Sequence, residues 1–459
     1  MARLWAEAVS HHDAHRMRVL MVAMLALVSM LMAADASAAR RARAPAPALT
    51  SAERKLADRV DHARPETLML LERAVNQNSG TMNLAGVKSV SAMFAAELDA
   101  LGFRTRWVEG AAWGRAGHLI AERGSKGPKV VLVGHLDTVF EPDSPFQRFT
   151  RVNDSTATGP GVCDMKGGNV ILLVALRALR DAGDLDRMRI TVVLTGDEER
   201  PGTPLVSARA DLVSAAEGAS AAIGFEDGDG DPQHVVVTRR GSSTWTLRVR
   251  GTPSHSSQVF REDVGPGAIF EAARLLQAFR DSLAFEPYLT YNPGLIAGGT
   301  TVSYDPVAAR ATAFGKSNVV AESTLVTGDL RMLSEDQHER ARAVMRRIVG
   351  SPTPGTWASI EFADGYPPLA PSDGNRKLLA MLDQASRDLG LGALEPVDPA
   401  RAGAADVSFL AGRVPMIVDA LGMKGSGGHT VNETARLKCL GWQAQRVAVT
   451  LSRMARAAK

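Results

Sequence analysis

Short apolar runs alternate with helical patterns along the first half of the chain. Three of these runs, at residues 130–133, 190–195 and 221–225, are bounded by glycine or polar residues, as buried strands are. The apolar residues between them recur at helical spacing, most clearly over 170–179. Because parallel sheets alternate with helices and are buried on both faces, the pattern predicts an α/β domain with a mostly parallel sheet.

The residues before the first run predict further helices and two short strands. Helical patterns cover 51–75 and 87–101, and strands are expected at 104–108 and 118–122. Together with the three buried strands, these elements make up the first part of the α/β domain, which we place at residues 51–238.

The pattern of apolar positions changes near residue 239. Residues 244–250 alternate between apolar and polar side chains, as a strand with one solvated face does. The later elements are a helix at 267–279, strands at 288–297 and 325–332, a helix at 335–349 and a strand at 357–362. This β-α-β-β-α-β order is ferredoxin-like. We therefore expect an inserted α+β domain over 239–366.

The first domain is expected to resume over 367–459. A helix at 375–389 and a strand at 415–419 come first in this segment. A glycine-rich loop at 425–430 follows, and a closing helix is expected from about residue 434. The α/β domain would thus be built from two segments that flank the inserted domain.

The chain begins with a pattern typical of a targeting segment. Basic residues precede an apolar run over 19–34, and three small residues follow at 36–38, as in a secretory signal peptide. The run is shorter than the roughly 20 residues that a membrane span needs. We predict a signal peptide over 1–38, a Pro- and Ala-rich linker over 39–50, and a periplasmic or secreted protein that is free of the membrane after cleavage. An uncleaved anchor and a start at Met17 remain alternatives.

Composition narrows the possible chemistry. A chain of 459 residues is long for one core, which supports two domains. The formal net charge of +3 argues against nucleic acid as a partner. Cys163 and Cys439 are the only cysteines, so a disulfide framework and a CxxC zinc site are both excluded. Any metal ion must therefore be bound by His, Asp and Glu.

Histidine and carboxylate side chains gather at the predicted strand ends and in adjoining loops. They are His135, Asp137, Asp164, Glu198, Glu199, Glu226 and His429. Ligands of α/β sheets collect at such ends. Acids gathered there would repel one another, and two divalent ions about 3.5–4 Å apart, sharing one carboxylate, would balance the charge and suit hydrolysis. The alternative is structural, with His135 in a turn and Asp164 capping a helix.

Six segments, in this order and spacing, resemble one enzyme family. They are residues 134–139, 161–168, 197–199 and 225–226, the predicted inserted domain, and residues 428–430. Together they resemble the co-catalytic dizinc metallopeptidases that include glutamate carboxypeptidase, aminoacylase, acetylornithine deacetylase and succinyl-diaminopimelate desuccinylase. The resemblance covers nearly the whole mature chain. It implies a zinc exopeptidase-like fold whose inserted domain acts as a lid and as the interface of a homodimer.

The resemblance implies a ligand set for two zinc ions per chain, with cobalt or manganese as alternatives. His135 and Glu226 would bind one ion, Glu199 and His429 the other, and Asp164 would bridge them.

Other residues would act on the substrate by the same resemblance. Asp137 would orient the first histidine ligand, and Glu198 would be the general base and then protonate the leaving amine. In the inserted domain, His255 would enter the other subunit's site to bind the substrate or its oxyanion. Arg331 would bind a free carboxylate of the substrate, and Asn292 would assist it.

The predicted function is hydrolysis of an amide bond next to a free carboxylate. The substrate would be a small peptide or an N-acyl amino acid, as for a glutamate carboxypeptidase-like peptidase or a deacylase. Glu226 favours this side of the family, because some aminopeptidase relatives have Asp there. A dipeptidase or aminopeptidase of the same fold is one alternative. A catalytically inactive binding protein on this scaffold is the other.

Overall fold

The computed structural model describes residues 49–306 and 308–457. The predicted signal peptide, 1–38, and nearly all of the predicted linker lie outside the described residues. Among the helices that are described, none combines the length and apolar character needed to cross a bilayer.

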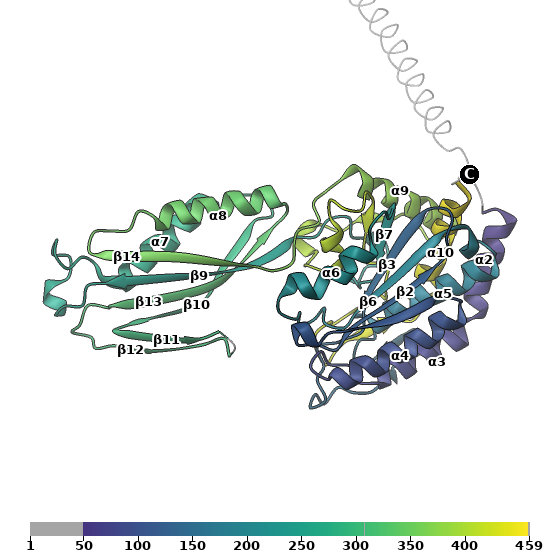
Figure 1. The fold of residues 1–459 in the computed structure, drawn as a ribbon, viewed down its shortest axis with the longest axis horizontal. Helices are drawn as coiled ribbons and strands as arrows, with labels where there is room; N and C mark the ends of the chain where they lie inside the picture. The colour runs from purple at the N-terminus through teal and green to yellow at the C-terminus, as the bar shows by residue number, and fades with distance from the viewer. Residues whose placement is uncertain (1–48, 307, 458–459) are drawn as a thin grey trace, which may run out of the picture. The chain divides into compact units, whose positions relative to one another are not determined.

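A six-stranded sheet forms the centre of the larger domain (Figure 1). Its spatial order is β1 (Arg104–Glu109), β2 (Gly117–Arg123), β6 (Arg189–Thr195), β3 (Lys129–His135), β7 (Ala221–Gly224) and β16 (Ile417–Val418). β3 pairs in parallel with β6 and β7, and β7 with β16. β1 and β2 are antiparallel additions at one edge. The predicted α/β class with a mostly parallel sheet is confirmed.

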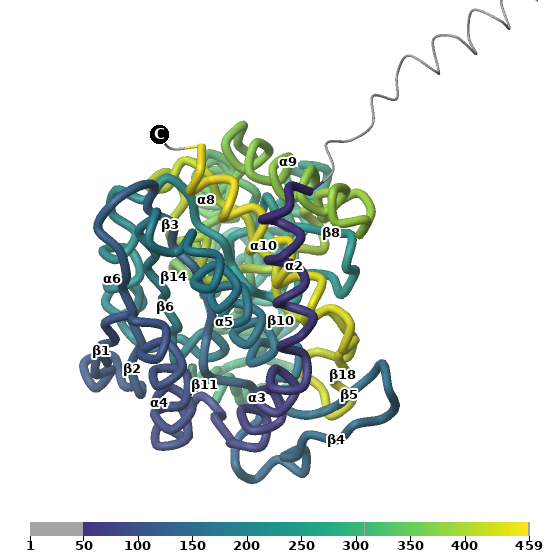
Figure 2. Tube along the Cα trace, turned by 90° about the vertical axis from the view of Figure 1, so that its right-hand side faces the viewer, coloured from purple at the N-terminus to yellow at the C-terminus, as the bar shows by residue number. Residues whose placement is uncertain are grey.

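Helices bury β3 from both sides. Val131 and Val133 share an apolar cluster with Leu212 of α6 (Leu205–Ala215). Side chains alternate along a strand, so the neighbouring residues of β3 face the other side of the sheet, where α5 (Lys166–Asp181) contacts β3. Figure 2 shows α5 beside the helices that pack on it. These helices are α2 (Ser51–His62), α3 (Arg64–Asn76) and α10 (Lys438–Ala457). Helix α4 (Leu84–Ala100) instead contacts β1 and β2.

A separate four-stranded antiparallel sheet lies in the inserted segment. Its order is β10 (Thr290–Gly299), β13 (Ser323–Met332), β9 (Gly241–Gly251) and β14 (Thr356–Asp364). Helices α7 (Gly267–Leu283) and α8 (Glu335–Val349) pack on it (Figure 1). Trp245, Phe279 and Met345 belong to the core between them. Along the chain, the four strands of this sheet and its two helices come in the order β9-α7-β10-β13-α8-β14, which is the predicted β-α-β-β-α-β order.

Some local features differ from the predicted elements. A hairpin of β11 (Thr301–Asp305) and β12 (Arg310–Phe314) is added, and its mostly exposed residues give no apolar pattern. The helical pattern over 51–75 divides at Ala63, because Pro65 starts a new helix. The closing helix begins only at Lys438, because the preceding residues form strand β18 (Thr434–Arg436), which pairs with β5 (Thr156–Thr158).

The two segments that connect the sheets pair with each other. Arg239 and Leu369 form an isolated antiparallel bridge. The Ser242 amide donates to the Tyr366 carbonyl at 2.8 Å, and the Gly365 amide donates to the Ser242 carbonyl at 3.1 Å. The chain therefore leaves and re-enters the larger domain at one place. The last segment then forms α9 (Asp373–Asp388), β16 and α10.

Candidate metal centre

Separate segments of the larger domain supply the five predicted metal ligands. His135 is the last residue of β3, Glu199 follows β6, Glu226 follows β7, Asp164 precedes α5, and His429 lies between β17 (Gly425–Ser426) and β18. The parallel strands end at one edge of the sheet, so the side chains that follow them meet there.

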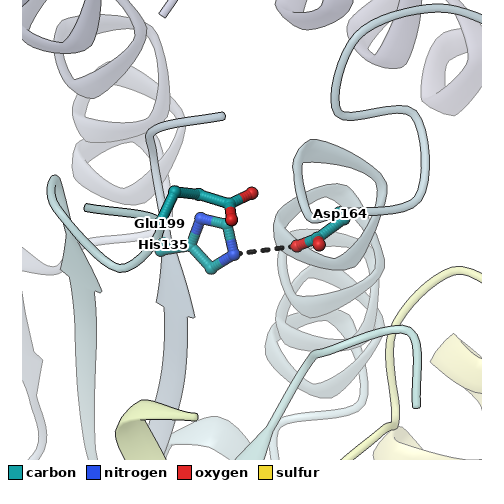
Figure 3. Close-up of side chains that lie close together, drawn as sticks. All are labelled: His135, Asp164 and Glu199. Atoms are coloured by element: carbon teal, nitrogen blue, oxygen red, sulfur yellow. Dashed lines mark hydrogen bonds and ion pairs between the residues drawn. The ribbon is translucent and has the colours of Figure 1, made fainter. Parts of the chain in front are cut away.

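Asp164 lies between the two histidines. Its Oδ1 is 2.9 Å from His135 Nε2, as drawn in Figure 3, and its Oδ2 is 3.0 Å from His429 Nε2. Glu226 Oε1 is 3.4 Å from His135 Nε2, and Glu199 Oε2 is 3.1 Å from His429 Nε2. The five side chains thus form two groups that share Asp164. Their binding of metal ions stays a prediction.

The protein's own charges leave this cluster unbalanced. Burial raises the pKa of Glu199 to about 7, and nearby Asp164 adds to the effect. Burial, followed by the charge of Glu226, raises the pKa of Glu198 well above its usual range. Hydrogen bonds to Asp164 and Glu199 raise the pKa of His429 to about 11. Divalent cations would replace the protons that such a cluster otherwise takes up.

The donor set also fits metal ions. Glu199 Oε1 is buried and has no hydrogen-bond partner within the described part of the chain. A buried carboxylate oxygen in this position is costly unless a cation or donor meets it. Imidazole nitrogens and carboxylate oxygens are donors that zinc accepts. The residues present therefore suit a pair of divalent ions.

Asp137 connects the first histidine to the turn that carries the glutamates. The His135 Nδ1 lies 3.1 Å from the Asp137 carbonyl and 3.4 Å from its Oδ1, so Nδ1–H donates and Nε2 stays available to a metal ion. The buried Asp137 carboxylate accepts bonds from Thr81 Oγ1 and from the amides of Glu198 and Glu199. These contacts suit the orienting role that was predicted for Asp137.

Glu198 lies beside the first ligand group. One donor atom each of Glu198, His135 and Glu226 lie within 4.8 Å of one another. The adjacent Glu199 instead groups with His135 and Asp164. Both glutamates thus lie near His135, but each lies beside a different acid of the cluster, as their adjacency at a strand end predicts. At this place Glu198 can either donate to a cation or move a proton.

A buried arginine that the sequence did not predict contacts the turn that carries the two glutamates. Arg209 of α6 is 1% exposed and donates to Asp197 Oδ1 at 2.6 Å and to Asp406 Oδ1 at 2.7 Å. It also donates to the Tyr366 hydroxyl, which in turn donates to the Glu198 carbonyl. Burial alone would lower the pKa of Arg209, but the charge of Asp406 and its neighbours raises it well above its usual range. No local pattern predicts these partners, because they are far apart in sequence.

The predicted residues of the inserted domain have local partners in the part of the chain that the structure describes. His255 is exposed and bonds to the Ser257 hydroxyl through Nδ1. Arg331 on β13 forms an ion pair with Asp329 at 2.8 Å, and Asn292 on β10 lies opposite Asp329. Within the described residues, no hydrogen bond or ion pair joins these side chains to the five predicted ligands. Their roles toward the substrate stay predictions.

Known proteins are similar to this chain in sequence and in fold. Residues 131–452 match the model of peptidase family M20/M25/M40. Carboxypeptidase G2 of a Pseudomonas species is 23% identical over 373 residues, which cover 80% of this chain and 84% of that protein. Succinyl-diaminopimelate desuccinylase of Gluconacetobacter diazotrophicus is 30% identical, but over only 37% of this chain and 46% of the relative.

A solved structure of a described metal-binding peptidase shares this fold. The YXEP protein of Bacillus subtilis, described as a dinuclear metal binding peptidase, superimposes with a TM-score of 0.61 at 14% identity, over 86% of this chain and 99% of that one. Peptide-like substrates and dinuclear metal sites are typical of the family. Since the family match extends over most of the chain and candidate metal groups lie within it, the protein is an enzyme of the M20/M25/M40 metallopeptidase family.

Proposed function

We propose that this enzyme hydrolyses an amide bond next to a free carboxylate, as a carboxypeptidase or an N-acyl-amino-acid deacylase. The position of Asp164 between two ligand groups, with Glu198 beside the first, carries the proposal. The similarity to carboxypeptidase G2 and to a desuccinylase supports this substrate class. Export of the enzyme stays a prediction, because its signal lies outside the described residues.

Two divalent ions, zinc foremost, would be held by the five predicted ligands. When bound, they would supply Lewis acidity and lower the pKa of a water molecule. Glu198 would take a proton from the attacking water and pass it to the leaving amine. Asp137 would keep the His135 ring in the orientation that this chemistry needs.

Arg331 is the proposed anchor for the substrate's carboxylate. Its side chain is 39% exposed, and it is paired with Asp329 through Nε. A guanidinium fork matches a planar carboxylate with two parallel hydrogen bonds. Asn292 lies opposite Asp329 in the sheet and would assist by hydrogen bonding.

A homodimer through the inserted domain would complete the site. Phe260 and Phe270 are both exposed, and their rings lie 5.4 Å apart. Ile269 on the same helix and Ile296 on the edge strand β10 are exposed as well. An apolar patch of this kind is typical of a protein interface. A two-fold interface would let each His255 reach the partner's metal centre reciprocally.

Complementation tests this exchange. His255→Ala and Glu198→Ala homodimers should each be nearly inactive. After subunit exchange, the mixture should regain about a quarter of the wild-type activity, because one site of each mixed dimer has its own base and a borrowed histidine. The absence of recovery in mixed dimers, which differential tags would identify, would show that His255 acts within its own chain.

A panel of paired substrates tests the proposed activity. N-acyl amino acids and dipeptides with a free α-carboxylate should be cleaved. The same compounds with that carboxylate amidated should lose roughly 10–100-fold in kcat/KM, the value of charged hydrogen bonds. The active protein should contain about two divalent ions per chain, and a chelator should abolish turnover. If cleavage instead requires a free amine on the substrate, the enzyme is an aminopeptidase or dipeptidase. If the protein binds metal ions but cleaves no substrate, it is a binding protein.

A further inference from the structure

Glu433 is a buried carboxylate that contacts the loop before α5. Its Oε1 accepts hydrogen bonds from the amides of Cys163 at 2.7 Å and Asp164 at 3.1 Å. Its Oε2 accepts a third from the amide of Gly161 at 3.0 Å. The side chain is fully buried, so water does not compete for these amides. One carboxylate therefore accepts hydrogen bonds from three backbone amides of the loop that ends in Asp164.

The same residue ends the loop that carries His429. The Glu433 amide donates to the Thr430 carbonyl at 3.1 Å, which closes this loop. The Thr158 hydroxyl donates to the Glu433 carbonyl at 2.6 Å, and strand β18 begins at the next residue and pairs with β5. Glu433 thus connects, through its side chain and backbone, the two loops whose Asp164 and His429 side chains meet.

The loop before α5 depends on this acceptor. Gly161 has a φ of +76°, and a Cβ there would lie 2.8 Å from Thr138 Cγ2, so the backbone is confined. Three nearby amides turn toward a single point, which is how a backbone binds an anion. Without the Glu433 carboxylate, these buried amides would lack a hydrogen-bond partner, which is unfavourable for each of them. The loop would then have to move.

We propose that Glu433 is a positioning residue that fixes the separation between Asp164 and His429 and thereby forms the second metal site. This inference rests on the proposed pair of metal ions. The first site depends less on Glu433, because His135 and Glu226 are placed by β3 and β7. Loss of the Glu433 carboxylate should therefore weaken one site selectively.

Metal titration of Glu433→Gln tests the proposal. Glutamine keeps the size of the side chain but replaces one acceptor oxygen with a donor that faces an amide. We expect one zinc ion to stay bound and the affinity of the second to fall by about 10–100-fold, as when other partners of metal ligands are removed. Zinc-buffered dialysis with elemental analysis measures both affinities without reference to activity.

Glu271→Gln is the matched control. Glu271 is equally buried and accepts bonds from the Thr353 amide, the Thr353 hydroxyl and Arg274, but in the inserted domain. This variant should lose stability and keep both ions. Equal affinity of Glu433→Gln and wild type for the second ion would overturn the proposal, and so would equal weakening of both sites.

A second variant tests the proposal if the first does not fold. If Glu433→Gln does not fold, Glu433→Asp is titrated instead. Its charge is retained but withdrawn by one methylene, so the second ion should again bind more weakly than in wild type. Unchanged binding would overturn the proposal. A wild-type protein with fewer than two ions would instead contradict the proposed function, which separates the two failures.

Discussion

Replacing Glu198 with glutamine is expected to lower kcat by roughly 10²–10⁴-fold, the contribution of general acid–base catalysis. The amide has nearly the same shape but does not accept a proton at neutral pH. The backbone around it should persist, because the Glu198 amide donates to Asp137 and its carbonyl accepts from Tyr366. Steady-state kinetics with elemental analysis should therefore show slow turnover and two bound ions.

The neighbouring residue provides the control for this variant. Glu199→Gln should lose affinity for one ion, because Glu199 Oε2 contacts His429 in the second ligand group. Nearly full activity of Glu198→Gln would show that another group is the base. Loss of an ion from Glu198→Gln would assign Glu198 to the ligands, which its distance from His135 and Glu226 also permits.

Replacing Arg209 with methionine is expected to lower the free energy of unfolding by about 3–5 kcal/mol, the typical cost of removing one partner from a buried ion pair. Two carboxylates, Asp197 and Asp406, would keep their burial and lose their cation. The Tyr366 hydroxyl would lose a donor in the same step. Denaturant unfolding followed by circular dichroism measures the difference.

An exposed ion pair gives the comparison for Arg209. Arg104 and Glu122 are 3.0 Å apart, but their side chains are 85% and 44% exposed. Arg104→Met should therefore change the free energy of unfolding by at most about 1 kcal/mol. Equal effects of the two substitutions would contradict a structural role for the buried network.

The elements that were predicted well carry their own local signals. The helix predicted at 335–349 has those bounds in the structure, because Ser334 caps its first turn and an apolar stripe faces the sheet. The candidate ligands at strand ends were predictable for the same reason, since each follows a buried apolar run. The closing helix was misplaced because residues 434–436 take their strand conformation from β5, a distant segment.

Contacts between distant segments explain what the sequence did not reveal. Arg209 lies among small and apolar residues of a helix, and its partner Asp406 is far along the chain. Glu433 accepts hydrogen bonds from backbone amides around Cys163. Nearly every residue has such an amide, so the residue types do not reveal this contact. Within the described part of one chain, no hydrogen bond or ion pair joins His255 to the predicted metal ligands. Its predicted role would depend on a second subunit, which a single sequence does not place.

The paired connecting segments bring the two ends of the inserted domain together. Since Ser242 and Gly365 are hydrogen-bonded to each other, the chain ends at the junction are already adjacent. Closing them with a tight turn would cost little loop entropy. An ancestor without the insertion would have needed only a short hairpin here, and the gene for a second domain can enter such a hairpin without changing the course of the surrounding chain.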